Sequence, residues 1–93
     1  MYNVEIIGTG SYVPEHRVSN DDLAKFVDTS DQWIRERTGI IERRISLEEN
    51  TTELAVKAAQ RALEDAHIAP EEIDLLIVAT VTPDYFFRST AGL

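Results

Sequence analysis

The order of apolar and polar positions predicts a chain in which short strands alternate with helices. The most regular segment begins at Asn50, which forms a capping-box pattern with Glu53 three residues later. We predict a helix from there to about Ala66. Its apolar face is mostly alanine, so the helix can lie close to a sheet; the face consists of Leu54, Ala55, Ala58, Ala59, Ala62, Leu63 and Ala66.

Three apolar runs predict strands, and one further segment predicts a short helix. The predicted strands are Val4–Tyr12, Ile40–Ile45 and Leu75–Ala79. The run Leu75–Ala79 does not alternate, which is typical of a parallel strand covered on both faces. A strand, a helix and a strand within about forty residues predict a right-handed βαβ unit, and hence an α/β fold. The short helix begins at Ser19 or Asn20 and ends at Val27.

The sequence Gly8-Thr9-Gly10 follows the first predicted strand and is partly similar to a dinucleotide-binding turn. Val13 stands where the third glycine should fall, and Pro14 follows where a helix should start. We therefore reject a dinucleotide site. The two glycines predict instead a bulge or a close approach between backbones.

The segment Asp28–Ile40 has strong signals for a second helix. Thr29 is the predicted N-cap, with Gln32 three residues later as the other half of a capping box. Gly39 is the predicted C-cap, because glycine takes the left-handed conformation that helix ends often need. Such a helix would end just before the strand predicted from Ile40.

Thr29, Trp33 and Arg37 stand four residues apart and would share one face of that helix. One interpretation packs Trp33, the only tryptophan, into a core and pairs Arg37 with a carboxylate; this is the commoner fate of such residues. The other interpretation is a nucleotide site, in which the indole stacks on a base and the guanidinium binds a phosphate. These three residues alone leave both open.

Composition excludes several classes of function. The net charge of −8 disfavours non-specific binding to nucleic acid or to an anionic membrane. The chain has no cysteine, and His16 and His67 lack a metal-ligand spacing, so we expect no metal site. The longest apolar run is too short to cross a bilayer, and the N-terminus lacks the basic start of a secretory signal. We expect a cytoplasmic protein.

Positive charge is concentrated in the segment Arg35–Arg44, which we call the basic segment. Its four arginines stand against two glutamates, which leaves a local charge of +2 and −10 for the remainder. A small anionic ligand or an acidic partner fits this distribution better than a long polyanion does. A solvated surface that neutralises itself is the alternative interpretation.

Several of these segments together resemble the opening of β-ketoacyl-acyl-carrier-protein synthase III, a condensing enzyme of the thiolase superfamily. The likeness runs through nearly all 93 residues in order, and the run Asp28–Ile40 is its most specific part. The resemblance implies that residues 1–93 are the N-terminal part of one thiolase-like domain, a βαβ unit within a layered αβαβα architecture. The matching segments are Ile6–Pro14, Asp28–Ile40 with Glu42 and Arg43, and Thr80–Ala91.

The resemblance also implies roles for individual residues. Trp33 and Arg37 match the positions at which the family holds the adenine and phosphate end of coenzyme A, and Thr29 matches a threonine nearby, so all three are the expected coenzyme A residues. Phe87 matches a residue that reaches across the dimer and shapes the partner's acyl pocket. Arg88 departs from the family pattern, which has proline after that phenylalanine. No catalytic residue is expected in this chain, because the family's cysteine, histidine and asparagine come later.

The family reaction moves an acyl group from acyl-CoA to a cysteine and condenses it with malonyl-acyl-carrier protein. The resemblance thus implies acyl-CoA and malonyl-acyl-carrier protein as partners, a homodimer, and no tightly bound cofactor, with the coenzyme A thioester as substrate. The alternative hypotheses are a non-catalytic module that binds coenzyme A or pairs with a larger subunit, and an inactive truncated gene product.

Overall fold

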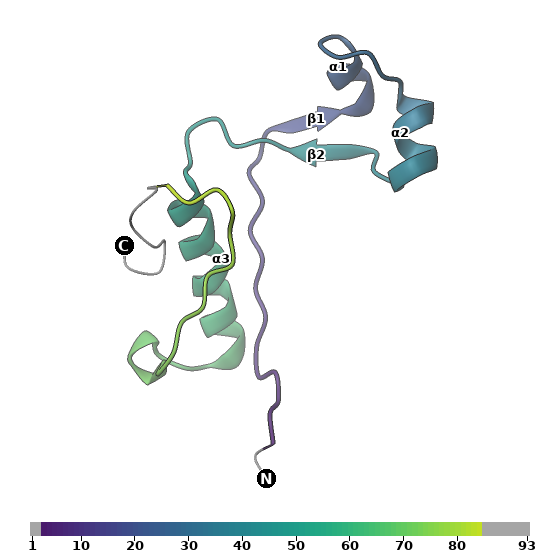
Figure 1. Cartoon of the computed structure of the whole chain (residues 1–93). Helices are drawn as coiled ribbons and strands as arrows, with labels where there is room; N and C mark the ends of the chain where they lie inside the picture. The colour runs from purple at the N-terminus through teal and green to yellow at the C-terminus, as the bar shows by residue number, and fades with distance from the viewer. Residues whose placement is uncertain (1–2, 85–93) are drawn as a thin grey trace. The chain divides into compact units, whose positions relative to one another are not determined.

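The computed structural model describes residues 3–84, which fall into two compact units. One unit comprises Met1–Tyr12 and Glu49–Leu93, and the other comprises Val13–Glu48. No helix in residues 3–84 is long and apolar enough to span a bilayer. In chain order the elements are β1 (Arg17–Ser19), α1 (Asn20–Ala24), α2 (Asp31–Thr38), β2 (Glu42–Arg44), α3 (Thr51–Ala66) and the 3-10 helix η1 (Pro70–Glu72) (Figure 1).

The unit Val13–Glu48 is built on a two-stranded antiparallel ladder between β1 and β2. The α1 helix follows β1 directly and begins at the N-cap Ser19, whose hydroxyl accepts from the amide of Asp22. The prediction that this helix reaches Val27 was wrong, because the backbone leaves the helix at the C-cap Lys25. The paired residues in the ladder are Arg17 with Arg44, Val18 with Arg43, and Ser19 with Glu42.

The α2 helix lies in the predicted segment but begins one residue later than predicted. Its N-cap is Ser30, whose Oγ accepts from the Trp33 amide at 3.2 Å, so the prediction of Thr29 was wrong. The capping box is absent as well, because the Gln32 amide donates to Glu36 along the helix instead. Gly39 is the C-cap with φ of 74°, which confirms the predicted end.

The α3 helix confirms the most regular part of the sequence pattern. It covers Thr51–Ala66, and the Asn50 side chain accepts from the Glu53 amide at 2.9 Å, as the cap prediction required. Its C-cap is His67, which has φ of 58° and is thus left-handed without being glycine. A side chain in this conformation has its Cβ too close to the following carbonyl oxygen.

His67→Gly should therefore stabilise the unit that contains α3. Removing the Cβ relieves a strain that costs about 1–2 kcal/mol, and the added freedom of glycine in the unfolded chain offsets part of the gain. We expect a net gain of roughly 0.5–1 kcal/mol in the free energy of unfolding, measured by urea denaturation of the complete protein. The matched control is Ala66→Gly, one residue earlier, which should destabilise by about 1 kcal/mol. Equal losses in both variants would show that the His67 conformation carries no strain.

The N-terminal segment packs against α3 at two glycines, which confirms the predicted close approach. A Cβ on Gly8 would lie 2.7 Å from the Ala66 Cβ, and a Cβ on Gly10 would lie 2.3 Å from the backbone nitrogen of Ala62. Figure 1 shows this segment passing beside α3. Glycines in the N-terminal segment and alanines in α3 thus let the two backbones approach closely. The glycines serve this packing and do not form a dinucleotide-binding turn.

The structure assigns no strand to Val4–Tyr12 or Leu75–Ala79 within the described residues, so these two predictions were wrong for this chain. A strand exists through hydrogen bonds to a neighbouring strand, and two separated extended segments cannot supply them. Their apolar side chains are exposed, to 94% at Val4 and 80% at Ile77. The predicted strand Ile40–Ile45 is present as the shorter β2, but it pairs antiparallel with β1, so no βαβ unit closes within residues 3–84.

Candidate functional site

The outer face of α2 carries an aromatic ring and a guanidinium in contact. The Arg37 Cζ lies 4.8 Å from the centre of the Trp33 ring, at the separation of a cation–π pair. The two residues stand one helical turn apart, as the predicted helix required. The Trp33 side chain is 53% exposed, so this unit does not use it as a core residue. The packing interpretation of this face is therefore not what the structure shows.

Thr29 lies beside this pair but not on the helix. Together with Asp28, Ser30 and Trp33 it lines an open hollow of about 310 Å³ at the start of α2. Thr29 is thus a loop residue, because the capping role belongs to Ser30. Trp33 links the other two residues, since it shares the hollow with Thr29 and contacts the guanidinium of Arg37. The three predicted site residues therefore lie at one surface.

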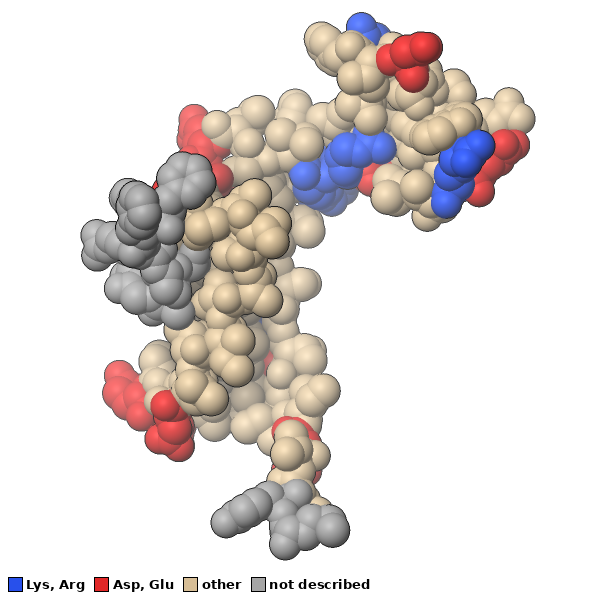
Figure 2. All heavy atoms as spheres, in the orientation of Figure 1, with Lys and Arg blue, Asp and Glu red and all other residues tan. Residues whose placement is uncertain are grey.

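Most of the basic segment is engaged inside its own unit. Arg35 pairs with Asp31 at 2.8 Å, whereas Arg43 and Arg44 donate to backbone carbonyls in and before β1. Among residues 3–84, Arg37 has no carboxylate within ion-pair distance. Figure 2 shows the Lys and Arg side chains of this unit in blue. Arg37 is thus the arginine of this segment best placed to meet an anion from outside.

Asp31 in the first turn of α2 is held in its charged form. The hydrogen bond from the Asn20 amide, together with the Arg35 guanidinium, keeps the pKa of Asp31 below its ordinary value. A carboxylate in the first turn also interacts favourably with the helix dipole. The acid and Arg35 thus neutralise each other, which leaves the charge of Arg37 at the outer face.

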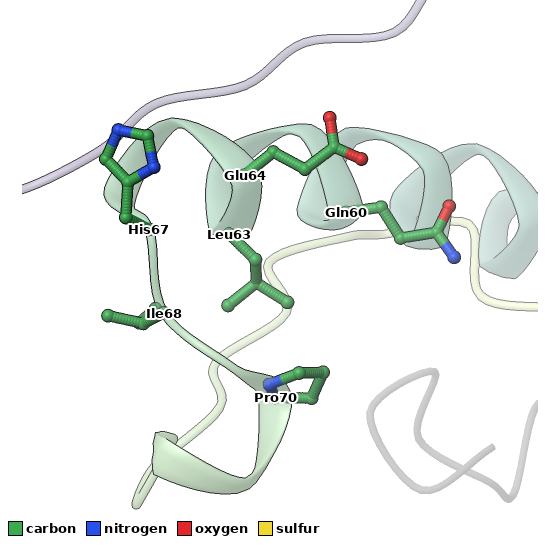
Figure 3. A pocket seen from close by; sticks show the side chains of 6 residues that line it. All are labelled: Gln60, Leu63, Glu64, His67, Ile68 and Pro70. Carbon is green, nitrogen blue, oxygen red and sulfur yellow. The ribbon is translucent and has the colours of Figure 1, made fainter.

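A larger hollow of about 630 Å³ lies at the C-terminal end of α3, but its lining gives no comparable chemistry. Figure 3 shows Leu63 on α3 and the side chains of Ile68 and Pro70 after the helix, whereas the polar ends of Gln60 and Glu64 point away from them. Among residues 3–84, no three acidic or histidine side chains gather as metal ligands. The lining residues are Gln60, Leu63, Glu64, His67, Ile68 and Pro70.

Asp84 has a structural role that is absent from the sequence-based predictions. Its carboxylate accepts from the backbone amides of Thr51 and Thr52, at 2.9 and 2.8 Å, and from the Thr52 hydroxyl. The segment after Leu75–Ala79 is thereby tied to the N-terminus of α3, where free amides favour a carboxylate. The partners are more than thirty residues apart, so no local pattern could indicate this contact. The predicted dimer loop residue Phe87, and Arg88 with it, lie outside the described residues.

Asp84→Asn should weaken this attachment at neutral pH and much less in acid. The Thr52 hydroxyl, helped by the two backbone amides, lowers the pKa of Asp84 from its ordinary value of about 3.9. Because the pKa is lower in the folded state than in the unfolded chain, the charged carboxylate stabilises the fold at any pH above its ordinary pKa. This stabilisation is lost as the pH falls from the ordinary pKa through the folded-state pKa.

The measurement is the urea midpoint of the complete protein and of the variant at about pH 7 and about pH 3. We expect the variant to have the lower urea midpoint at neutral pH, and we expect the difference between the two midpoints to be smaller in acid. Asp74→Asn, an exposed aspartate in the same unit, is the matched control and should change neither midpoint. A gap of constant size at both pH values would contradict a role for the charge of Asp84.

Comparison with solved structures shows that this chain has part of the thiolase-like α/β fold of the β-ketoacyl synthases. The crystal structure of 3-oxoacyl-[acyl-carrier-protein] synthase III from Aquifex aeolicus matches with a TM-score of 0.88 and 57% identity, over 92% of this chain and 28% of that one. The synthase III from Thermus thermophilus matches at 0.83 and 46%, over 95% and 28%. A priming β-ketosynthase from the R1128 polyketide pathway matches at 0.71 and 39%, over 84% and 25%. The predicted fold class, a partial thiolase-like α/β fold, is confirmed, although the predicted βαβ unit does not close within residues 3–84.

Sequence comparison gives the particular family. A β-ketoacyl-[acyl-carrier-protein] synthase III from Clostridium acetobutylicum is 65% identical over 91 residues, which are 98% of this chain. A synthase III from Clostridium botulinum strain 657 is 57% identical over the same length. No family model matches the chain. The chain is thus similar to β-ketoacyl-acyl-carrier-protein synthase III along almost its whole length, and it spans about 28% of the length of these relatives.

Proposed function

We propose that this chain is the N-terminal segment of a condensing enzyme that starts fatty-acid synthesis. The complete protein would take an acyl group from acyl-CoA and condense it with malonyl-acyl-carrier protein. The products would be β-ketoacyl-acyl-carrier protein, CO₂ and free coenzyme A. The similarity to synthase III sequences over 98% of the chain supports this proposal.

The nucleophile of this reaction would come from outside the 93 residues, since they contain no cysteine. A cysteine attacks the thioester as a thiolate, and the acyl-enzyme then receives the carbanion left by decarboxylation of the malonyl group. That carbanion is an enolate, which needs hydrogen-bond donors placed where its charge develops. The present chain would therefore contribute to binding and not to bond making.

The contribution of this chain is the mouth of the coenzyme A site. The observation that carries this proposal is the contact between Trp33 and Arg37 on the exposed face of α2. An exposed indole offers a stacking surface for adenine, and a guanidinium such as that of Arg37, which has no carboxylate partner among residues 3–84, can bind phosphate by paired hydrogen bonds. Thr29 at the adjoining hollow can donate a further hydrogen bond. Stacking and phosphate binding are the two requirements of the nucleotide end of coenzyme A.

The remaining parts of the proposal follow from the same resemblance. Phe87 would reach across a homodimer and shape the acyl pocket of the partner, and the enzyme would work in the cytoplasm without a tightly bound cofactor. The acidic acyl-carrier protein would dock mainly on surfaces that other parts of the complete protein supply. The local positive charge of the basic segment can assist that docking.

An activity assay on the complete natural protein tests this proposal. With acetyl-CoA and malonyl-acyl-carrier protein, we expect the release of coenzyme A and CO₂ and the formation of acetoacetyl-acyl-carrier protein. A protein that binds coenzyme A but transfers no acyl group would favour the non-catalytic module. The intact mass of the protein as its source organism makes it is the first control. A mass equal to that of these 93 residues alone would contradict the proposal that the protein is an enzyme.

A further inference from the structure

Asn20 is a polar side chain that the fold buries almost completely. It is 1% exposed, and the only other buried side chain among residues 3–84 is Ile34 at 7%. A buried amide must find hydrogen bonds, and Asn20 finds one for every group it has. Its Nδ2 donates to Asp31 Oδ1 at 2.9 Å and to the Ile40 carbonyl at 2.7 Å, and its Oδ1 accepts from Arg43 at 2.6 Å.

Two of the three partners of the Asn20 side chain stand at the two ends of α2, and the third, Arg43, lies in β2. Asp31 is the first residue of the helix, and Ile40 follows directly after its C-cap Gly39. The backbone amide of Asn20 also donates to the Ile41 carbonyl at 3.2 Å, just after the C-terminal end of α2. Asn20 begins α1, which adjoins α2 in the same unit (Figure 1). The start of α1 thus holds both ends of α2 through hydrogen bonds.

Within the part of the chain that the structure describes, α2 has little buried surface that could fix its orientation. It has eight residues, of which Ile34 alone is buried. A helix this short is marginal by itself and takes its stability from tertiary contacts. Asn20 supplies the polar part of those contacts, and Ile34 supplies the apolar part. The direction in which Trp33 and Arg37 face therefore depends on Asn20, although Asn20 is not a member of their stack.

We propose that Asn20 is a positioning residue for coenzyme A, which holds α2 so that Trp33 and Arg37 face the ligand together. This inference rests on the proposed function, because it takes the surface of Trp33 and Arg37 to be the coenzyme A site that the hydrogen bonds of Asn20 hold in place. Asn20 acts only through the helix and has no contact with the ligand. Its loss should therefore affect the binding of acyl-CoA and leave the later chemistry nearly unchanged.

The first test compares Asn20→Ala with a matched control in the complete protein. We expect the KM for acetyl-CoA to rise roughly tenfold, because small displacements of a binding group are expensive, while kcat and the KM for malonyl-acyl-carrier protein change less than about twofold. The control is Ser19→Ala. It removes the N-cap hydrogen bond of α1 and destabilises that helix, but the Ser19 side chain has no hydrogen bond to α2. This variant should leave the KM for acetyl-CoA unchanged. An equal rise in both variants would reduce Asn20 to a general stability role and overturn the proposal.

The second test combines Asn20→Ala with Trp33→Ala. If Asn20 acts through the stack, its substitution should raise the KM for acetyl-CoA by less than about twofold once Trp33 is gone. Independent, additive effects would overturn the positioning role while the coenzyme A site stands. No effect of Trp33→Ala alone would instead reject the proposed site itself. If Asn20→Ala does not fold, Asp31→Ala replaces it, with an expected rise of about threefold and the same lack of additivity.

Discussion

Gly10→Ala should destabilise the protein severely, because the new side chain would overlap the backbone of α3. Its Cβ would meet the Ala62 backbone nitrogen at 2.3 Å and the Ala58 carbonyl oxygen at 2.6 Å. These backbone atoms cannot move aside as the end of a flexible side chain can. We expect a loss of roughly 3 kcal/mol or more in the free energy of unfolding, or failure to fold. Urea denaturation and the yield of soluble complete protein measure it.

Gly39→Ala separates packing from backbone conformation and serves as the control. No atom of residues 3–84 lies within 4 Å of a Cβ at Gly39, but its φ of 74° is left-handed. We expect a loss of about 1 kcal/mol from backbone strain alone. If Gly10→Ala costs no more than Gly39→Ala, the N-terminal segment does not pack on α3 as tightly as the structure indicates.

Trp33→Ala should weaken the use of acyl-CoA by roughly 1–3 kcal/mol, the usual contribution of an aromatic side chain stacked on a base. The loss should appear in the KM for acetyl-CoA, with a well-folded protein, because Trp33 is half exposed and little of the fold depends on it. Arg37→Ala should act in the same direction through the lost phosphate contact. The effects of the two substitutions should not add fully, since the side chains contact each other.

Gln32→Ala is the matched control for these two variants. It lies on the same helix, next to Trp33 in sequence, but its side chain bonds to Glu36 along the helix surface. The KM for acetyl-CoA should stay unchanged in this variant. An unchanged KM in a folded Trp33→Ala protein would reject the role of the indole, and a raised KM in Gln32→Ala would show that α2 responds to any substitution.

Local signals are sufficient for the elements that depend on neighbouring residues. Gly39 and Asn50 are recognisable as caps because the conformation of glycine and the hydrogen bond between Asn50 and Glu53 are set within one turn. The predicted N-cap of α2 is wrong by one residue because the local sequence offers two candidates. Thr29 and Ser30 are adjacent hydroxyl residues, and the local sequence does not decide which of them accepts from the helix.

Long-range contacts leave no such local signal. The sequence indicates Asn20 only as a possible cap of α1, since its partners come from α2, β2 and the segment between them. The contacts of Asp84 escape prediction for the same reason. The strands predicted at Val4–Tyr12 and Leu75–Ala79 require partner strands that residues 3–84 do not provide. An apolar run in the sequence indicates a tendency to form a strand, but it does not show where the partner strand comes from. The pairing of Trp33 with Arg37, by contrast, needs only helical spacing and is predictable.

The measurement that tests the central claim most directly is a crystal structure of the complete protein with coenzyme A bound. The proposed function predicts that adenine stacks on the exposed face of Trp33, that a phosphate group accepts hydrogen bonds from Arg37, and that Thr29 lies beside the nucleotide. Coenzyme A bound elsewhere, with the Trp33–Arg37 pair empty or covered by another part of the protein, would contradict the site proposed on α2.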